Sequence, residues 1–102
     1  RQILGNDYTV QSAWEKALAN ANSKLKSEPE NYYGGFNKAV ALFYLGNYKD
    51  SVNEYEKVAS LLPQRMLWYQ LEPIYAYQKI GEFEKAISII DGILANGNQA
   101  YS

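Results

Sequence analysis

The stretch LGNYKDSV at residues 45–52 returns 35 residues later as IGEFEKAI at residues 80–87. A looser version, QSAWEKAL, stands 34 residues before the first of these, at residues 11–18. A phrase that recurs with a period of about 20–50 residues is the sequence signature of repeat proteins, in which similar units stack on one another. The spacing therefore predicts an array of repeated units, and the residues of the phrase predict the secondary structure of each unit.

The glycine of the phrase predicts a sharp turn between two helices. Gly46 and Gly81 each follow an apolar segment that is expected to end a helix. The residue after a helix end commonly adopts a positive φ, which glycine does without strain. Asn47 is then placed to cap the next helix, with Asp50 three residues later as its partner in a capping box. Each unit is therefore expected to be a helical hairpin.

Two further columns of the repeat concern the second helix of each unit. A large ring is expected in its first turn, facing back toward the helix just ended: Trp14, Tyr48 and Phe83. A small residue three positions later would let two helices approach closely: Ala17, Ser51 and Ala86. For the first of these helices, Ser12 with Glu15 could form the capping box, although Thr9 could equally begin the helix.

Apolar residues at three- and four-residue steps predict an all-α chain. We expect five antiparallel helices joined by short loops, near residues 9–27, 30–45, 48–62, 64–80 and 83–96. Pro29 and Pro63 cannot continue a preceding helix but fit the opening of the next. Pro73 falls inside the fourth helix, where we expect a kink, with a break into two shorter helices as the alternative.

The composition excludes several functions. The chain of 102 residues is 47% hydrophobic and 21% charged, which is typical of one soluble globular domain, and it contains no cysteine or histidine. Disulfides, zinc sites built from these residues and triads with a histidine base are therefore excluded, and we expect a non-catalytic chain without a cofactor or metal. A net charge of −1 and scattered lysines argue against nucleic-acid binding, and uncharged stretches such as residues 39–48 are too short to cross a membrane.

These residues resemble the tetratricopeptide repeat family. Ser51, Tyr55 and Pro63 match the small, aromatic and proline positions of its second helix, and residues 46–48 and 81–83 match its glycine-polar-aromatic turn. The resemblance implies a right-handed α-α superhelix, a solenoid of about 2.5 repeats with five helices. It implies one domain over residues 1–102, which we expect to be part of a longer array or multidomain protein.

The resemblance covers roughly residues 12–96 and departs from the family pattern in the first helices. The family's tryptophan, leucine-glycine and tyrosine are replaced in the first full repeat by Gly35, Lys38, Ala39 and Leu42, and in the second only Tyr77 fits. A narrower resemblance concerns residues 62–102. That segment resembles the repeat region that trails papain-like cysteine peptidases of the bacteriocin-processing type in uncultured bacteria, which implies an appendage of a peptidase whose catalytic residues lie upstream.

In such a solenoid the first helix of each repeat lines a concave surface. Equivalent positions in the two full repeats pair as Tyr33 with Trp68, Phe36 with Leu71, Val40 with Tyr75, and Tyr44 with Lys79, with Asn37 and Glu72 beside them. Since these residues are mostly apolar or aromatic, we expect a groove that binds an extended or helical peptide segment of a protein partner. The clamp of basic residues and asparagines that binds chaperone tails is missing, apart from Asn37. Aromatic residues at helical spacing could instead belong to the core.

Two other functions stay open on the sequence alone. The chain could be a purely structural spacer or a self-association element, because an array of two and a half units would leave apolar helix faces uncapped at both ends. Pentatricopeptide arrays, which bind RNA, also use helical hairpins of about 35 residues. The acidic balance, with a sequence pI near 5.4, argues against that function.

Overall fold

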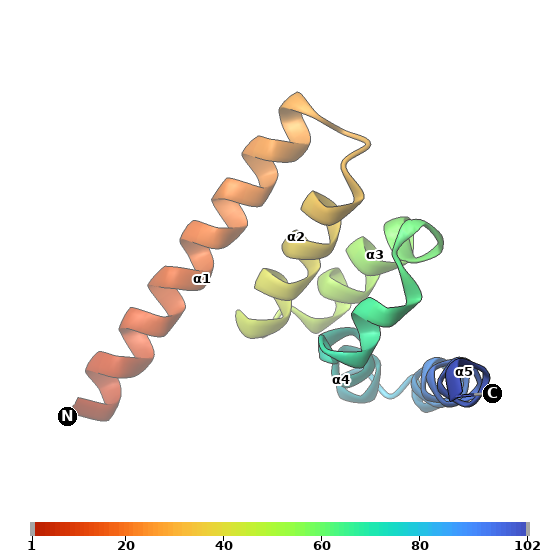
Figure 1. Ribbon diagram of the computed structural model, residues 1–102. Helices are drawn as coiled ribbons and strands as arrows, with labels where there is room; N and C mark the ends of the chain where they lie inside the picture. Colours follow the sequence, from red (N-terminus) through yellow and green to blue (C-terminus); the bar gives the residue numbers. More distant parts are fainter. Residues whose placement is uncertain (1, 102) are drawn as a thin grey trace.

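A computed structural model describes the backbone of residues 2–101 and the side chains of residues 9–63 and 65–95. The chain forms five α-helices: α1 (Gln2–Ser27), α2 (Tyr32–Tyr44), α3 (Tyr48–Val58), α4 (Glu72–Lys79) and α5 (Phe83–Tyr101) (Figure 1). Two short 3-10 helices, η1 (Ala59–Leu61) and η2 (Gln64–Trp68), connect α3 to α4. Residues 2–101 contain no strand, so the prediction of an all-helical chain with five helices is confirmed.

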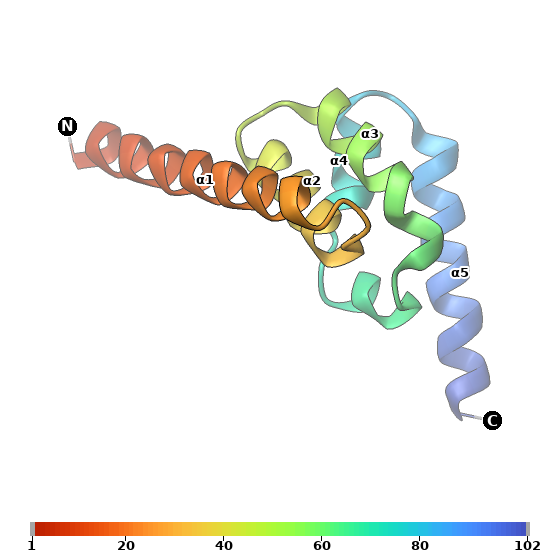
Figure 2. The same ribbon diagram turned by 90° about the horizontal axis from the view of Figure 1, so that it is seen from above.

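The helices are arranged in chain order. Each α-helix contacts the next one along the chain, and α2 also contacts α4. Figure 1 shows α1 running upward and α2 returning beside it, and Figure 2 shows α1 and α5 at opposite ends of the molecule. The molecule is elongated, with extents of 49 × 36 × 25 Å. Each of the two end helices, α1 and α5, therefore has one side without a neighbouring helix among the described residues.

The turn between α2 and α3 depends on a glycine with a left-handed backbone. Gly46 has a φ of 85°, and its N–H donates to the carbonyl of Phe43 at 3.0 Å. The N–H of Asn47 donates to the carbonyl of Leu42 at 2.9 Å. These two bonds satisfy carbonyls that the end of α2 would otherwise leave without partners, in the arrangement known as the Schellman motif.

The turn between α4 and α5 repeats this geometry 35 residues later. Gly81 has a φ of 81°, its N–H donates to Gln78 at 3.2 Å, and the N–H of Glu82 donates to Tyr77 at 2.8 Å. The prediction that both glycines adopt positive φ is confirmed. Two separate parts of the chain therefore reverse direction by the same mechanism.

The predicted capping box at Asn47 is wrong. Asn47 occupies the N-cap position of α3, but its side chain makes no capping hydrogen bond. A capping box would require the Asn47 N–H to donate to Asp50, and that N–H already donates to the carbonyl of Leu42. The hydrogen bond from the Asn47 N–H to Leu42 therefore takes the place of the predicted capping box.

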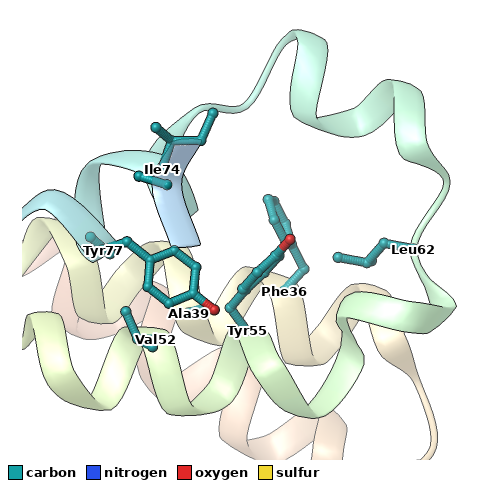
Figure 3. Packing of buried hydrophobic residues seen from close by; sticks show 9 residues of the cluster. Phe36, Ala39, Val52, Tyr55, Leu62, Ile74 and Tyr77 are labelled. Carbon is teal, nitrogen blue, oxygen red and sulfur yellow. The ribbon is translucent and has the colours of Figure 1, made fainter. Parts of the chain in front are cut away.

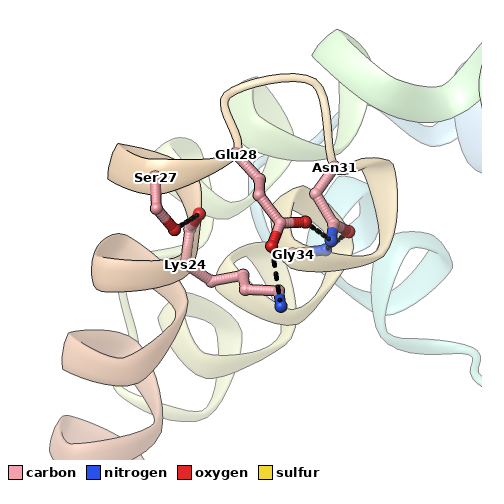
Figure 4. A network of polar contacts seen from close by, with 5 residues as sticks. All are labelled: Lys24, Ser27, Glu28, Asn31 and Gly34. Carbon is pink, nitrogen blue, oxygen red and sulfur yellow. Dashed lines mark hydrogen bonds and ion pairs between the residues drawn. The ribbon is translucent and has the colours of Figure 1, made fainter.

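A side-chain cap that the sequence analysis did not identify begins α2. Asn31 Oδ1 accepts from the N–H of Gly34 at 2.8 Å, and Asn31 Nδ2 donates to Glu28 Oε1 at 3.0 Å (Figure 4). Glu28 also pairs with Lys24 Nζ at 3.1 Å, while the Ser27 hydroxyl donates to the Lys24 carbonyl. The hydrogen bond from Asn31, followed by Lys24, lowers the pKa of Glu28 below its ordinary value. This network fixes the connection from α1 to α2.

The boundaries of α1 and α5 differ from those predicted. α1 begins at Gln2, so neither Thr9 nor Ser12 starts a helix, because the preceding turns already supply the hydrogen bonds that a cap would replace. α5 continues past residue 96 to Tyr101. Trp14 consequently lies in the middle of α1 rather than in a first turn.

The two later prolines explain the other boundary errors. α3 ends at Val58 rather than at residue 62, and Leu62 is extended, as expected for a residue that precedes a proline. The kink predicted at Pro73 is wrong, and the alternative of a break is correct. Pro73 lies in the first turn of α4, where its missing N–H costs no hydrogen bond, and the preceding segment forms η2 instead.

The core lies where α2, α3, α4 and α5 meet (Figure 3). Its buried members are Phe36, Ala39, Val52, Tyr55, Leu62, Ile74, Ala76, Tyr77 and Ala86. The small positions Ser51 and Ala86 are both buried, and the Ser51 hydroxyl donates to the carbonyl of Ala39 at 2.6 Å. Ala17 is half-buried beside α2. Small residues thus allow close helix contact where the repeat placed them.

The aromatic column does not share one environment. The Tyr48 ring lies edge-on to Phe43 of the preceding helix, at 5.4 Å between centroids, as predicted. Phe83 is 59% exposed, because Gln78 occupies in α4 the position that Phe43 occupies in α2. Trp14 contacts Tyr44 of the following helix rather than a preceding one. The prediction of a backward-facing ring is therefore confirmed for Tyr48 and wrong for Trp14.

A polar cluster joins three helices at one edge of the core. The Tyr77 hydroxyl of α4 donates to Glu56 Oε2 of α3 at 2.7 Å, and Lys85 Nζ of α5 lies 3.4 Å from the same oxygen. Burial, with the bond to Glu56, raises the pKa of Tyr77. The bond from Tyr77, assisted by Lys85 and opposed by partial burial, lowers the pKa of Glu56.

Substituting the turn glycines should destabilise the fold by about 1–2 kcal/mol each, because a β-carbon is strained at positive φ. Gly46→Ala and Gly81→Ala would be measured by urea unfolding. Gly92→Ala is the matched control: Gly92 lies inside α5 and an added Cβ would meet no atom within 4 Å. This control should gain about 0.5–1 kcal/mol, and equal effects at the three positions would contradict the assigned role of the turns.

The Glu56 interaction should make stability depend on acid pH. Because the folded pKa of Glu56 lies below its ordinary value of 4.5, its stabilising contribution is present above that value and is lost as the pH falls through the lower, folded value. The free energy of unfolding should therefore differ between the chain and Glu56→Gln at pH 7, and this difference should shrink between about pH 5 and pH 3. A difference that stays constant over this range would show that the Glu56 charge contributes nothing.

Candidate functional site

A hollow of about 580 Å³ opens between the second half of α1 and α2. Residues of α1, α2 and the segment before α4 line it: Trp14, Ala17, Asn20, Ala21, Lys24, Asn31, Tyr33, Gly34, Asn37, Val40 and Gln70. We call this feature the α1–α2 hollow. Its lining combines apolar side chains with carboxamides, and α2 supplies residues from its first turn to its third.

Three of the predicted groove residues line the α1–α2 hollow. Tyr33 is 48% exposed, Asn37 is exposed, and Val40 is half-buried. They lie four and three residues apart on α2, and this spacing places them on one side of a helix. These three predicted residues therefore lie on the side of α2 that faces the hollow.

The polar part of the lining is mainly neutral. Asn20, Asn37 and Gln70 are exposed, and each carries one acceptor oxygen and two donor hydrogens. The cation of the lining, Lys24, is paired with Glu28. The hollow is thus equipped to pair with neutral hydrogen-bonding groups rather than with a strong charge.

A series of aromatic rings extends from the hollow across three helices. The Trp14 ring of α1 stacks on Tyr44 of α2, with centroids 4.5 Å apart and planes 14° apart. Tyr44 lies edge-on to Phe43 at 5.0 Å, and Phe43 lies 6.5 Å from Tyr75 of α4. Tyr44 and Tyr75 are each 47% exposed, so the series presents ring surface to solvent as well as holding the helices together.

The hydroxyl of Tyr44 adds a polar link to α4. It donates to Glu72 Oε2 at 2.7 Å, and this bond is the main reason that the pKa of Tyr44 is raised, with burial second. The other oxygen, Glu72 Oε1, is buried and has no hydrogen-bond partner among the described residues.

The remaining predicted groove residues lie elsewhere. Phe36 has no exposed surface and belongs to the core, so its assignment to the groove is wrong. Trp68 and Leu71 are partly exposed but do not line the hollow, and Lys79 Nζ lies 5.7 Å from the centroid of the Tyr48 ring. Residues at equivalent positions of the two repeats therefore do not all lie on the same surface.

The sequence analysis missed the contribution of α1. Trp14, Ala17 and Asn20 line the hollow, yet α1 was expected to lie behind the groove as a second helix. Trp14 and Ala17 had already been singled out as repeat positions, so the signal was present but was assigned to packing. Gln70, which also lines the hollow, gave no signal because it lies in an irregular segment.

A second hollow, of about 620 Å³, lies between α2 and α3 and offers less for recognition. Its lining is largely charged, and Glu54 there is 3.0 Å from Lys57 and 3.8 Å from Lys38. Among the side chains that the structure describes, no three His, Cys, Asp or Glu residues are grouped so that they could hold a metal ion. The α1–α2 hollow with its aromatic rings is therefore the candidate site.

The Trp14–Tyr44 stack should contribute about 0.5–1.5 kcal/mol beyond the area that the rings bury. A double-mutant cycle of Trp14→Ala and Tyr44→Ala, followed by urea unfolding, would measure it as the coupling energy. Trp14→Ala combined with Tyr69→Ala is the control, because Tyr69 is 79% exposed, and its coupling should be near zero. Equal coupling in the two cycles would mean that the stack does not dock α1.

Comparison of the chain with protein-family models, with curated proteins and with solved structures finds no match in any of the three. The tetratricopeptide resemblance therefore depends on the residues and turns described above. Within residues 2–101, no helix combines the length and the apolar character that crossing a membrane requires.

Proposed function

We propose that this chain is a non-catalytic module that binds a peptide segment of a protein partner in the α1–α2 hollow. The observation that carries the proposal is the composition of this lining. Exposed ring surface at Tyr33 stands beside the exposed carboxamides of Asn37 and Gln70. A peptide offers the complementary groups, because it carries apolar side chains and a backbone with one donor and one acceptor at most residues.

The expected energetics fit a modest affinity. Burying one apolar or aromatic side chain fully contributes about 1.5–3 kcal/mol, and ordering the peptide offsets part of that gain. Two anchoring contacts and a few hydrogen bonds would thus give binding in about the micromolar range. Weak, exchangeable binding is typical of modules that hold a partner rather than transform it.

We also propose that the helices form part of a right-handed α-α superhelix of the tetratricopeptide type. Equivalent positions are buried in both hairpins, in pairs 35 residues apart: Ala39 and Ile74, Ala41 and Ala76, Leu42 and Tyr77, Ser51 and Ala86. The two glycine turns support the same proposal. In such a superhelix α2 and α4 would present their outer residues to the concave side.

Two features argue against other functions. Glu54 and Glu56, which stand two residues apart, are engaged with lysine and with tyrosine respectively, so they do not form a free pair for acid–base catalysis. The one cation of the hollow is neutralised by Glu28, which gives no basic surface for an RNA backbone.

A random peptide library displayed on phage tests the proposal directly. Peptides selected on the folded chain should bind about tenfold more weakly to Tyr33→Ala and to Asn37→Ala, since each substitution removes a contact of about 1.4 kcal/mol. Tyr69→Ala is the control and should bind as the unaltered chain does. Circular dichroism should show the same melting temperature for all four proteins, because the substituted residues are exposed.

Failure to select any peptide, or equal binding by Tyr33→Ala and Tyr69→Ala, would contradict a peptide-binding function at the hollow. The remaining role for the chain would then be that of a structural spacer.

A further inference from the structure

The last helix presents an apolar row that nothing in the described structure covers. Phe83, Ile87, Ile90 and Leu94 are 59%, 55%, 38% and 60% exposed. Their spacing of four, three and four residues places them on one side of α5. The adjacent side of the same helix packs inward through Ile89 and Ile93. An exposed apolar row of this length is unusual on a surface that faces only water.

The repeat identifies what these positions do one unit earlier. The residues 35 positions before them are Tyr48, Val52, Tyr55 and Ala59. Val52 and Tyr55 are only 5% and 6% exposed, and they belong to the core with Ile74 and Tyr77 of α4. The rings of Tyr55 and Tyr77 meet edge to face, with centroids 6.1 Å apart. The same helix side is thus covered in α3 and bare in α5.

The helix before α5 shows the same contrast. Leu71, just before α4, is 36% exposed, whereas its equivalent Phe36 in α2 is completely buried in the core. We call Leu71 and the apolar row of α5 together the end face. Phe36, Val52 and Tyr55, the equivalents of Leu71, Ile87 and Ile90, belong to one core cluster with Ile74 and Tyr77 of α4, so the end face reproduces an interface that the molecule already contains.

We propose that the end face binds an amphipathic helix with the apolar pattern of α4. What argues for this occupant is continuity with the α3–α4 interface. The helix that covers α3 supplies Ile74, Ala76 and Tyr77, all of them buried, after a segment that begins at Pro63. A helix with an aliphatic residue, a small residue two positions later and a tyrosine three positions later would fill the end face in the same way.

The opposite end of a second copy of this chain is a poorer match. Side chains exposed on the outer side of α1 are mainly polar, among them Gln11, Glu15, Lys16, Asn22 and Lys26. A head-to-tail contact between copies would therefore place these polar groups on an apolar row and remove their hydration. We accordingly expect no head-to-tail association of the chain at micromolar concentration.

A labelled peptide with the sequence of residues 63–79 is the probe, because this segment covers the equivalent surface one unit earlier. Fluorescence anisotropy should show saturable binding to the full chain. The double substitution Ile87→Ser, Ile90→Ser should weaken it at least about tenfold, because two buried aliphatic contacts are lost. Leu61→Ser is the matched control, since Leu61 is 57% exposed but lies on η1, and it should leave binding unchanged. A peptide with serine in place of Ile74 and Tyr77 should not bind.

A second measurement decides the matter if the free peptide is too short to form a helix. Residues 1–97 would be followed directly by a second copy of residues 63–97, which keeps the 35-residue spacing. The extended chain should melt at least about 4 °C above the original, and Ile87→Ser should lower its melting temperature more than it lowers that of the original.

Two results would overturn the proposal. One is the absence of both peptide binding and any rise in the melting temperature of the extended chain. The other is a dimer of the unaltered chain in sedimentation velocity that Ile87→Ser, Ile90→Ser abolishes, which would make a second copy the occupant.

Discussion

The left-handed backbone at Gly46 and Gly81 is the constraint on which the rest of the structure depends. At each glycine two backbone N–H groups turn back onto the last carbonyls of the preceding helix, so the helix ends without losing hydrogen bonds. The chain then leaves in a direction that brings the next helix against the one just finished. Contact is close because Ser51 and Ala86 follow the turns at the same distance, and a hydroxyl bonded to a carbonyl fixes the first of these contacts. Neither feature depends on a large apolar side chain.

Although the two turns are equivalent, the exposed fraction of a side chain in the helix that follows depends on which helices lie beside it rather than on its residue type. Valine at position 52 is buried and isoleucine at position 87 is exposed, although both are aliphatic and stand at the same place in the repeat. The difference is that α4 lies against α3, while no helix in the described structure lies against the row on α5. The backbone geometry of the turn is thus the same in both hairpins, but the hydrophobic stabilisation of the helix that follows the turn is not. The α2–α3 hairpin thus depends on α4 for part of its core.

The same distinction separates what the sequence could and could not predict. The turns at Gly46 and Gly81 and the all-helical fold follow from local chemistry, namely glycine after an apolar helix end, and were predicted correctly. The break at Pro73 was only the second choice, because a proline tolerates either a kink or a new first turn and the packing of η2 decides between them. Phe36 was placed in the groove because it matched Leu71, yet Phe36 is completely buried in the core and Leu71 is 36% exposed. Trp14 was identified as a repeat position but was predicted to contact the wrong helix, because its stacking partner on α2 lies thirty residues away in sequence. Long-range contacts, which no period reveals, account for these errors.

The helical period explains how α2 can carry both the core and the candidate site. Residues 33, 37, 40 and 44 recur at steps of four, three and four and form one side of the helix, which faces the hollow and the aromatic rings. Residues 35, 36, 39 and 42 form the other side, where even the absence of a side chain matters, since a Cβ on Gly35 would come within 2.7 Å of Val58 Cγ1. The second set is buried by packing inside the molecule, whereas Tyr33 and Asn37 of the first set are exposed. Side chains at 33 and 37 can therefore be changed while the packing on the opposite side of α2 stays as it is, and the proposed binding at the hollow would change with them.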